Sequence, residues 1–274
     1  LAWSLLSRCI PLSFLWRNNM KLKSKLLLAA LATSSAAFAQ TAPAAAESAI
    51  AYNVGVVSEY RYRGLAQTKG DPALQGGVDY TNPNGFYLGA WASTIKWIKD
   101  SAAVGGTSTK GPVELDIYGG YKFEAAGVGF DVGYLRYEYL NNTLKNNTAF
   151  TNANTDEVYG AATYGVATLK YSYALSDLFG NINSKGSTYW DLSATFDLGN
   201  GYTLVPHAGR QTVKNNTNSY TDIALTLNKD LGDGWSASVS AISTNGKGKA
   251  PFASALTSYD TAKNTTVVGL KYSF

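Results

Sequence analysis

His207 is the only histidine in the 274-residue chain, so it is the one side chain that can act as an imidazole base. A serine or cysteine hydrolase needs a nucleophile next to such a base. Val205 and Gly209, two positions away along an extended strand, share the face of His207 and carry no nucleophile. The single cysteine, Cys9, lies near the N-terminus, so the rest of the chain has no thiol to ligate zinc, iron or haem. These residues predict no enzyme, no cofactor and no metal site.

Charged residues recur at every second position in several segments of the chain. In the segment 113–124, the even positions include Glu114, Asp116, Lys122 and Glu124, whereas the odd positions are mostly apolar. Residues two apart on a strand point the same way, so these charges form one stripe. Such a stripe can brace a wall by pairing opposite charges, or it can line a path for polar solutes.

The elements that must hold these stripes are strands. Apolar and polar residues alternate with a period of two in segments of about ten residues after position 51. No run there approaches the roughly eighteen apolar residues of a transmembrane helix. In the strand at 127–139 the apolar parity changes after Tyr134, which predicts a bulge. We predict an all-β fold with twelve strands, at about 52–64, 72–81, 85–98, 113–124, 127–139, 155–163, 166–175, 187–198, 202–211, 219–229, 235–244 and 263–274.

The connections between these strands alternate between long and short. The short ones have 2 to 5 residues and carry turn sequences such as Gly199-Asn200-Gly201, whereas the long ones have 7 to 18 residues. Outer-membrane barrels have tight periplasmic turns and long outer loops on an even number of antiparallel strands. The pattern therefore predicts a transmembrane antiparallel up-and-down β-barrel of about twelve strands, with both termini periplasmic.

Aromatic residues gather at both ends of the predicted strands. Amphipathic rings are favoured at the two membrane–water interfaces, so this placement predicts two aromatic belts around an aliphatic band. The belt near the short turns contains Tyr80, Phe123, Phe196, Tyr202, Trp235, Tyr272 and Phe274, and the belt near the long loops contains Tyr60, Tyr62, Tyr137 and Tyr139.

The last predicted strand ends at an aromatic residue. Val268, Leu270, Tyr272 and Phe274 occupy alternate positions up to the C-terminus. A soluble domain normally leaves a polar tail at this point. The pattern is typical of the terminal strand of outer-membrane barrels, which their assembly machinery recognises. We interpret these four residues as an assembly signal.

Residues 1–39 have the composition of a leader. They hold five cations and no acid, so the rest of the chain has 23 − 5 = 18 Lys and Arg against 19 Asp and Glu. The formal charge thus falls from +4 to −1, which gives no reason to expect a nucleic-acid partner. Three lysines, an apolar core and a small-residue site predict a signal peptide over 20–39, with cleavage between Ala39 and Gln40. We expect 1–19 to be an upstream, non-native start, 40–51 a short lead-in and 52–274 one barrel domain.

The opening of the predicted barrel resembles a known family. The runs Asn53-Val54-Gly55, Ser58-Glu59-Tyr60-Arg61-Tyr62-Arg63-Gly64 and Gly85-Phe86-Tyr87, together with Trp91, resemble the start of the TorF-type porins, a proteobacterial family. A weaker likeness continues through Asp131-Val132-Gly133-Tyr134 and His207-Ala208-Gly209-Arg210 to Phe274. The resemblance implies an outer-membrane barrel and a pore.

In a membrane barrel the polar face must point inward, because an Arg or Lys that faces lipid at mid-bilayer costs ~2–4 kcal/mol. We expect most inward charges to pair along the wall, with Arg61 and Arg63 as the best candidates for a strip that attracts anions. The long loops 140–154 and 245–262 are candidates for folding inward. The predicted pore-lining residues are Glu59, Arg61, Arg63, Asp79, Glu114, Asp116, Lys122, Glu124, Asp131, Lys170, Asp191, Asp197, His207 and Lys271, with Arg136 and Glu138 if the bulge is present.

Twelve strands lie between the ~8 whose interior side chains can fill and the roughly 16–18 of open porins. The sequence favours a porin-like channel of the Gram-negative outer membrane, exported through the periplasm, for passive diffusion of small polar solutes through a narrow charged lumen. Its partners are then the solutes, outer-membrane lipid and lipopolysaccharide, and the barrel-assembly machinery. A closed structural barrel, an outer-membrane hydrolase and a secreted soluble binding module are the alternatives. The permeant and the oligomeric state stay open.

Overall fold

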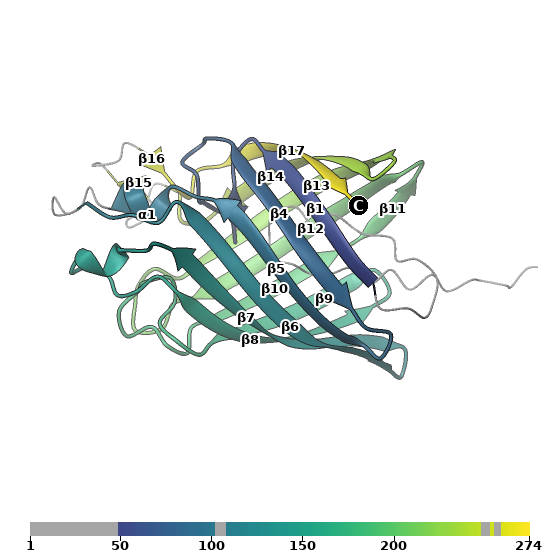
Figure 1. Cartoon of the computed structure of the whole chain (residues 1–274), viewed down its shortest axis with the longest axis horizontal. Coiled ribbons are helices and arrows are strands. Elements are labelled where there is room, and N and C mark those ends of the chain that lie inside the picture. Colours follow the sequence, from purple (N-terminus) through teal and green to yellow (C-terminus); the bar gives the residue numbers. More distant parts are fainter. Residues whose placement is uncertain (1–48, 102–107, 248–252, 255–258) are drawn as a thin grey trace, which may run out of the picture.

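The computed structural model describes residues 49–101, 108–247, 253–254 and 259–274. The predicted leader, its cleavage site at Ala39 and Gln40 and most of the lead-in lie outside these residues. The described chain forms one barrel, whose strands run obliquely between an end with short turns and an end with long loops (Figure 1).

The wall consists of twelve antiparallel strand segments, which we call staves. This arrangement confirms the predicted up-and-down barrel. Their order around the barrel follows the sequence, and β1 pairs with β17 to close the ring. One stave is divided at Thr195 into two strands, β10 and β11, which both pair with β12. The staves are β1 (Ala49–Val57), β4 (Ala73–Thr81), β5 (Phe86–Thr94), β6 (Val113–Ala125), β7 (Val128–Leu140), β8 (Thr155–Tyr164), β9 (Ala167–Ala174), β10 (Thr188–Ala194) with β11 (Phe196–Gly199), β12 (Tyr202–Thr212), β13 (Tyr220–Gly232), β14 (Trp235–Thr244) and β17 (Thr265–Ser273).

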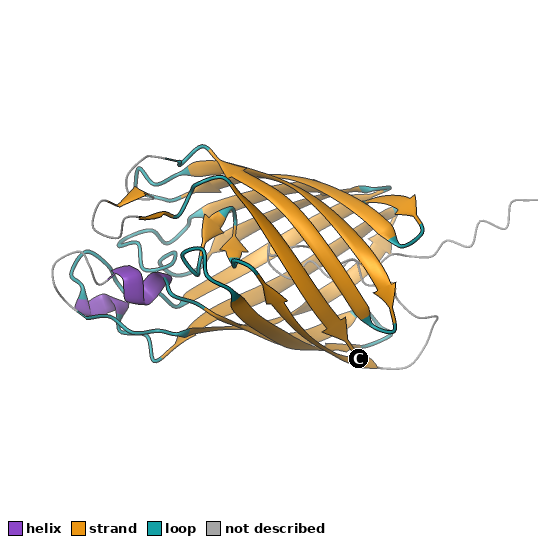
Figure 2. Ribbon diagram, turned by 90° about the horizontal axis from the view of Figure 1, so that it is seen from above, coloured by secondary structure: helices purple, strands orange, loops and turns teal. Residues whose placement is uncertain are grey.

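The remaining elements are short. They are β2 (Arg61–Tyr62), β3 (Leu65–Ala66), helix α1 (Trp97–Asp100), the 3-10 helix η2 (Leu144–Asn146), β15 (Ala253–Ser254) and β16 (Tyr259–Asp260). Figure 2 shows the helices at the long-loop end of the barrel. Within the described ranges, no helix is long and apolar enough to cross a membrane.

Side-chain exposure alternates along the staves, because successive residues of a strand face opposite sides of the wall. The outward positions carry aliphatic residues such as Val54, Leu192 and Leu225, which are 44%, 53% and 49% exposed. The inward positions carry polar residues such as Gln75 and Asp131, which are half-buried. An apolar outer band of this kind is unfavourable in water and favourable in hydrocarbon.

The structure agrees with one of the two predicted aromatic belts. Tyr80, Phe123, Phe196, Tyr202, Trp235 and Phe274 are exposed at the short-turn end of the wall. The second predicted belt is wrong, because Tyr60, Tyr62, Tyr137 and Tyr139 are all buried inside the barrel. Within the part of the chain that the structure describes, Tyr173 and Trp190 are instead the exposed aromatic residues on strands near the long loops.

The predicted bulge in the strand at 127–139 is absent. β7 pairs with β6 and with β8 in an unbroken register. Arg136 and Glu138 therefore face outward, near the long-loop end, and do not line the lumen. Arg136 Nη2 lies 2.7 Å from Glu138 Oε2, and Arg136 Nη1 lies 2.9 Å from Asp156 Oδ2 on β8. The phase change after Tyr134 arises because inward Leu135 and its aromatic neighbours belong to a packed interior.

The last residue of the chain closes the barrel seam. The Phe274 amide donates to the Tyr52 carbonyl at 3.0 Å, and the Tyr52 amide donates to the Phe274 carbonyl at 2.9 Å. Their rings stack with centroids 5.6 Å apart. Val268 and Leu270 are exposed on the same outward face of β17. The predicted assembly signal is thus an outward stripe beside the seam.

Candidate functional site: the lumen and its hairpin

The chain between β1 and β4 turns into the barrel instead of continuing the wall. β1 ends at Val57, which pairs with Ala73 at the start of β4, so the chain leaves and rejoins the wall at one point. Between them β2 and β3 pair, with Tyr62 opposite Leu65. We call residues 58–72 the lumen hairpin. The predicted wall strand that runs to residue 64 is therefore wrong beyond Val57.

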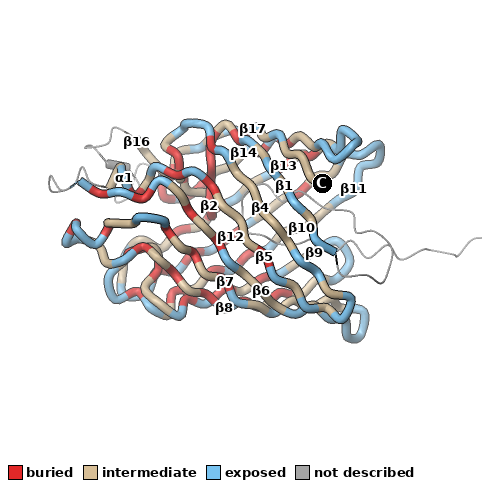
Figure 3. Tube along the Cα trace, viewed as in Figure 1, coloured by how far each residue is buried: buried red, intermediate tan, exposed pale blue. Residues whose placement is uncertain are grey.

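Arg63 and Gly64 form the tip of the lumen hairpin. Both have positive φ, 46° and 78°, as in a type I′ turn. A Cβ on Gly64 would lie 2.6 Å from Asp222 Cβ on β13 and 2.7 Å from Thr244 Cγ2 on β14. Only glycine fits there, because any side chain would overlap the wall. Figure 3 shows the buried trace of the hairpin at β2, inside the barrel.

Arg63 connects the hairpin tip to three further staves. Its Nη2 lies 2.8 Å from Glu157 Oε2 on β8, and its Nη1 donates to Gln211 Oε1 on β12 at 2.8 Å. The guanidinium also stacks 4.3 Å from the ring centroid of Tyr189 on β10. Burial opposes the charge of Arg63, but the Glu157 carboxylate raises its pKa above the ordinary value, so the ion pair persists.

Glu59 and Arg61 fix the base of the lumen hairpin. Arg61 Nε lies 2.8 Å from Glu59 Oε2, and Arg61 Nη1 donates to the carbonyls of Gly64, Thr261 and Lys263. The Tyr259 hydroxyl donates to Glu59, and burial together with this carboxylate raises the pKa of Tyr259. Both arginines are therefore buried and engaged by the protein, and the predicted anion-attracting strip of Arg61 and Arg63 does not form.

The carboxylates of β6 lie against the lumen hairpin. The Tyr60 hydroxyl donates to Glu114 Oε1 at 2.9 Å, and the Tyr60 ring packs edge-on against Trp91 at 5.5 Å. Burial and the Glu114 carboxylate raise the pKa of Tyr60, so its phenol stays a neutral donor. Asp116 is 1% exposed, and neither of its oxygens has a hydrogen-bond partner within the described chain. Glu114 and Asp116 thus lie inside the barrel but are covered.

His207 lies between two carboxylates inside the lumen. Its Nδ1 is 3.3 Å from Asp191 Oδ1, and its Nε2 is 3.2 Å from Asp222 Oδ2. The Tyr189 hydroxyl donates to Asp222 Oδ1 at 2.8 Å. Ser193 lies opposite His207 on β10, yet both ring nitrogens face carboxylates instead. A general base needs a free ring nitrogen beside its nucleophile, so this geometry does not support the hydrolase alternative.

Tyrosines line the short-turn half of the lumen, where most inward residues are half-buried. The Tyr118 hydroxyl donates to Asp79 Oδ1 at 2.5 Å, and the Tyr87 hydroxyl donates to Asp131 Oδ1 at 2.6 Å. A Cβ on Gly89, beside Tyr118 on the neighbouring strand, would lie 2.4 Å from its ring. The glycine therefore lets the ring lie along the wall, and this half stays more open than the half that holds the hairpin.

The other predicted lumen residues lie in this half or at its rim. Lys122 of β6, Lys170 of β9 and Lys271 of β17 are on the inward parity. Glu124 and Asp197 are exposed at the short-turn rim. Asp197 Oδ1 accepts a hydrogen bond from the Gly199 amide at 2.8 Å, so it shapes a turn.

Four side chains of the central network did not stand out in the sequence. They are Glu157, Tyr189, Gln211 and Asp222, and each is on the inward parity of a predicted strand. Strand parity alone could have found them. Parity could not indicate that Glu157, Tyr189 and Gln211 contact Arg63, because the pattern predicts Arg63 to be part of the wall.

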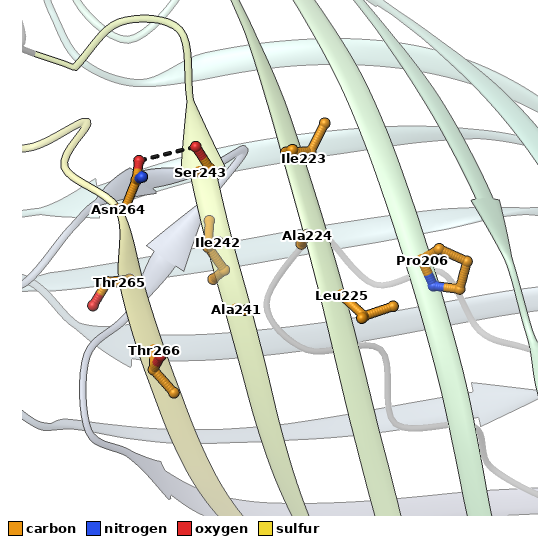
Figure 4. Close-up of a pocket in the computed structure, with 10 residues that line it drawn as sticks. All are labelled: Pro206, Ile223, Ala224, Leu225, Ala241, Ile242, Ser243, Asn264, Thr265 and Thr266. Atoms are coloured by element: carbon orange, nitrogen blue, oxygen red, sulfur yellow. Dashed lines mark hydrogen bonds between the residues drawn. The ribbon is translucent and has the colours of Figure 1, made fainter.

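A depression of about 630 Å³ lies where β12, β13, β14 and β17 run side by side, and Figure 4 labels the residues that line it. Pro206, Leu225, Ala241 and Thr266 are neighbours in one row across these strands and face outward. The depression has no charged lining residue.

Among the described residues, no group of three or more His, Cys, Asp or Glu is placed to hold a metal ion. The lumen is therefore the candidate site.

The fold and the lumen define a closed antiparallel β-barrel with an apolar outer band, a charged interior and an inward-folded hairpin. Residues 41–274 match the family described as bacterial protein of unknown function (Gcw_chp), and the chain belongs to that family. The description does not carry the TorF name, so that narrower resemblance stays a prediction. No curated protein matches the sequence.

Three solved structures illustrate the barrels to which the chain is similar. A KdgM porin in complex with disordered oligogalacturonate has 10% identity and a TM-score of 0.49, over 82% of this chain and 98% of that one. A NanC porin has 11% identity and a TM-score of 0.49, over 82% and 99%. Outer membrane phospholipase A from Escherichia coli has 15% identity and a TM-score of 0.42, over 81% and 92%. These likenesses are too remote to bear on function.

Proposed function

We propose that the protein is a channel of the Gram-negative outer membrane that passes small polar solutes by passive diffusion. The observation that carries the proposal is the closed twelve-stranded wall, aliphatic outside and charged inside. Such a wall satisfies every backbone hydrogen bond in hydrocarbon while it encloses a polar space. The first strand begins and the last strand ends at the short-turn side, which we assign to the periplasm, where export and the barrel-assembly machinery deliver the chain. Outer-membrane lipid and lipopolysaccharide then surround the wall.

The lumen hairpin sets the width of the proposed path. Its tip reaches Glu157 on β8 and Gln211 on β12, so it spans the interior from its root between β1 and β4. Solutes must therefore pass beside the hairpin at the long-loop end. We infer a narrow channel rather than an open aqueous pore.

A closed structural barrel is the second candidate, because the hairpin is well buried. Tyr60 is 0% and Arg63 4% exposed, which is the packing of a core rather than of a loose loop. We propose no catalytic role, because both ring nitrogens of His207 face carboxylates.

Single-channel recording separates the two candidates. The purified protein, extracted with detergent and inserted in a planar lipid bilayer, is expected to give discrete current steps smaller than those of sixteen-stranded porins. Asymmetric salt then reports the ion preference from the reversal potential. A bilayer that contains the folded protein and stays silent would favour the closed barrel, and extraction in buffer without detergent would overturn the membrane assignment itself.

A further inference from the structure

Two lysines in the short-turn half of the lumen lie over aromatic rings and form no direct ion pair with a carboxylate. Lys122 Nζ on β6 lies 4.7 Å from the ring centroid of Tyr87, and Lys170 Nζ on β9 lies 3.9 Å from that of Tyr159. Within the described chain, neither ammonium group lies within 4.0 Å of a carboxylate oxygen. A cation over a ring face is attracted to it, but the ring carries no net charge.

The carboxylates beside these lysines have other partners. Asp131 lies directly opposite Lys122 across the β6–β7 pair, yet it accepts the Tyr87 hydroxyl at 2.6 Å. Asp191 lies opposite Lys170 across the β9–β10 pair, yet it faces His207 Nδ1 at 3.3 Å. The expected cross-strand ion pairs are thus absent among these residues, although both registers would permit them.

Glycines hold the two aromatic partners in a fixed arrangement. The Tyr87 and Tyr159 hydroxyls hydrogen-bond to each other, so the two side chains are linked at their tips. A Cβ on Gly120 would lie 2.4 Å from the Tyr87 hydroxyl oxygen, and a Cβ on Gly133 would lie 2.6 Å from the Tyr159 ring. Both rings therefore lie along the wall, and each ammonium group lies over one of the two linked rings.

We propose that Lys122 and Lys170 form a binding site for small organic carboxylates inside the lumen. Lys170 is buried and Lys122 half-buried, and the nearby Asp131 and Asp191 attract them without direct contact. A carboxylate of a solute supplies the direct charge-assisted hydrogen bonds that the protein's own carboxylates do not. The site lies on the side of the lumen hairpin that faces the short turns. It does not involve Arg63, which stays paired with Glu157. The proposal rests on the proposed function only in that solutes reach the lumen.

Equilibrium dialysis of the detergent-solubilised barrel against labelled succinate tests this site without any measurement of transport. We expect K122Q and K170Q each to weaken succinate binding, and the double variant to weaken it by roughly tenfold or more. Neutral succinamide, which has the same length without charge, is expected to bind neither protein.

Lys229 provides a matched control. Its Nζ lies 4.3 Å from the ring centroid of Tyr202, so it has the same kind of aromatic partner, but it lies on the outward parity of β13 near a short turn. K229Q is expected to leave succinate binding unchanged. The far-ultraviolet circular dichroism of each variant shows whether the barrel is intact, and K170R, which keeps the charge, is expected to retain binding.

Succinate binding that is absent in the wild type, equal for succinamide, or lost equally in K229Q would overturn the site. The channel proposal fails separately, if bilayers stay silent while the wild type binds succinate. Conversely, currents with no succinate binding would leave the channel proposal standing and remove the lysine site.

Discussion

Gly64 is the residue on which the position of the lumen hairpin depends most directly. Its φ of +78° and the 2.6 Å approach of Asp222 Cβ exclude a side chain. We expect Gly64→Ala to displace the hairpin tip and to widen the path, with a loss of stability of more than about 1 kcal/mol. Single-channel conductance and urea unfolding of the same preparation measure the two effects.

Gly127 is the control for backbone strain at Gly64. It has a similar φ of +76°, but a Cβ there would meet no atom within 4 Å. Gly127→Ala is expected to cost the strain alone and to leave the conductance unchanged. If Gly64→Ala and Gly127→Ala have the same conductance and stability, the steric overlap between the hairpin tip and the wall has no part in narrowing the path.

The Arg63–Glu157 ion pair is the second single-residue determinant of the hairpin. Both side chains are buried, at 4% and 3% exposure. Removal of one partner leaves an uncompensated buried charge, which costs about 3–5 kcal/mol. We expect Arg63→Met to destabilise the packed hairpin and raise conductance, and the double variant with Glu157→Met to recover part of the loss. A double-mutant cycle, measured by urea unfolding, gives the coupling free energy between Arg63 and Glu157. Additive effects of the two substitutions would contradict the ion pair's role.

At the scale of elements, the sequence predicted the wall better than the hairpin. Period-two alternation located all twelve staves, because each stave has an apolar outer face and a different inner face. The same alternation in Glu59, Arg61 and Arg63 is also strand-like, and β2 is indeed a strand. Its partner is β3 rather than the wall, and pairing partners are long-range information that a single segment does not contain.

The rule that inward residues are polar holds best where the lumen is open. In the short-turn half, Asp79, Lys122 and Asp131 follow it. At the hairpin, the interior is a packed core, and Leu135 and Tyr137 are buried there in the cluster that includes Tyr60 and Tyr62. This is why the apolar pattern of β7 predicts a bulge, and why the lumen position that depends on the bulge is wrong for Arg136.

The seam between β1 and β17 is the element that depends on the last residue. Two backbone hydrogen bonds and a ring stack join Phe274 to Tyr52. We expect deletion of Phe274 to lower the amount of barrel assembled in the outer membrane, because the closing pair and the outward terminal ring are lost together. The heat-modifiable gel mobility of the membrane fraction measures folded barrel. Phe274→Tyr, which keeps ring and backbone, is expected to assemble normally, and equal assembly of the deletion variant would contradict the assembly signal.

At the scale of the whole molecule, the account requires lipid around the wall. Leu192 lies in the middle of its stave between Leu169 and Ala208, and it is 53% exposed. An arginine there would face hydrocarbon, so Leu192→Arg is expected to destabilise the barrel in lipid vesicles by ~2–4 kcal/mol in urea titrations. Ser193→Arg, one residue along and inward, is the matched control and is expected to cost less. Equal costs would mean that the outer face does not meet lipid.

The most direct test of the central claim, that the lumen hairpin fills a polar channel, is the conductance of a barrel without it. Val57 and Ala73 are already paired, so a short Gly-Ser turn can replace residues 58–72 without moving the wall. A control variant shortens the loop at 213–219, which joins β12 and β13 at the same end. We predict a several-fold higher single-channel conductance for the hairpin replacement and an unchanged conductance for the control. A hairpin replacement that folds and conducts no better than the wild type would contradict the account.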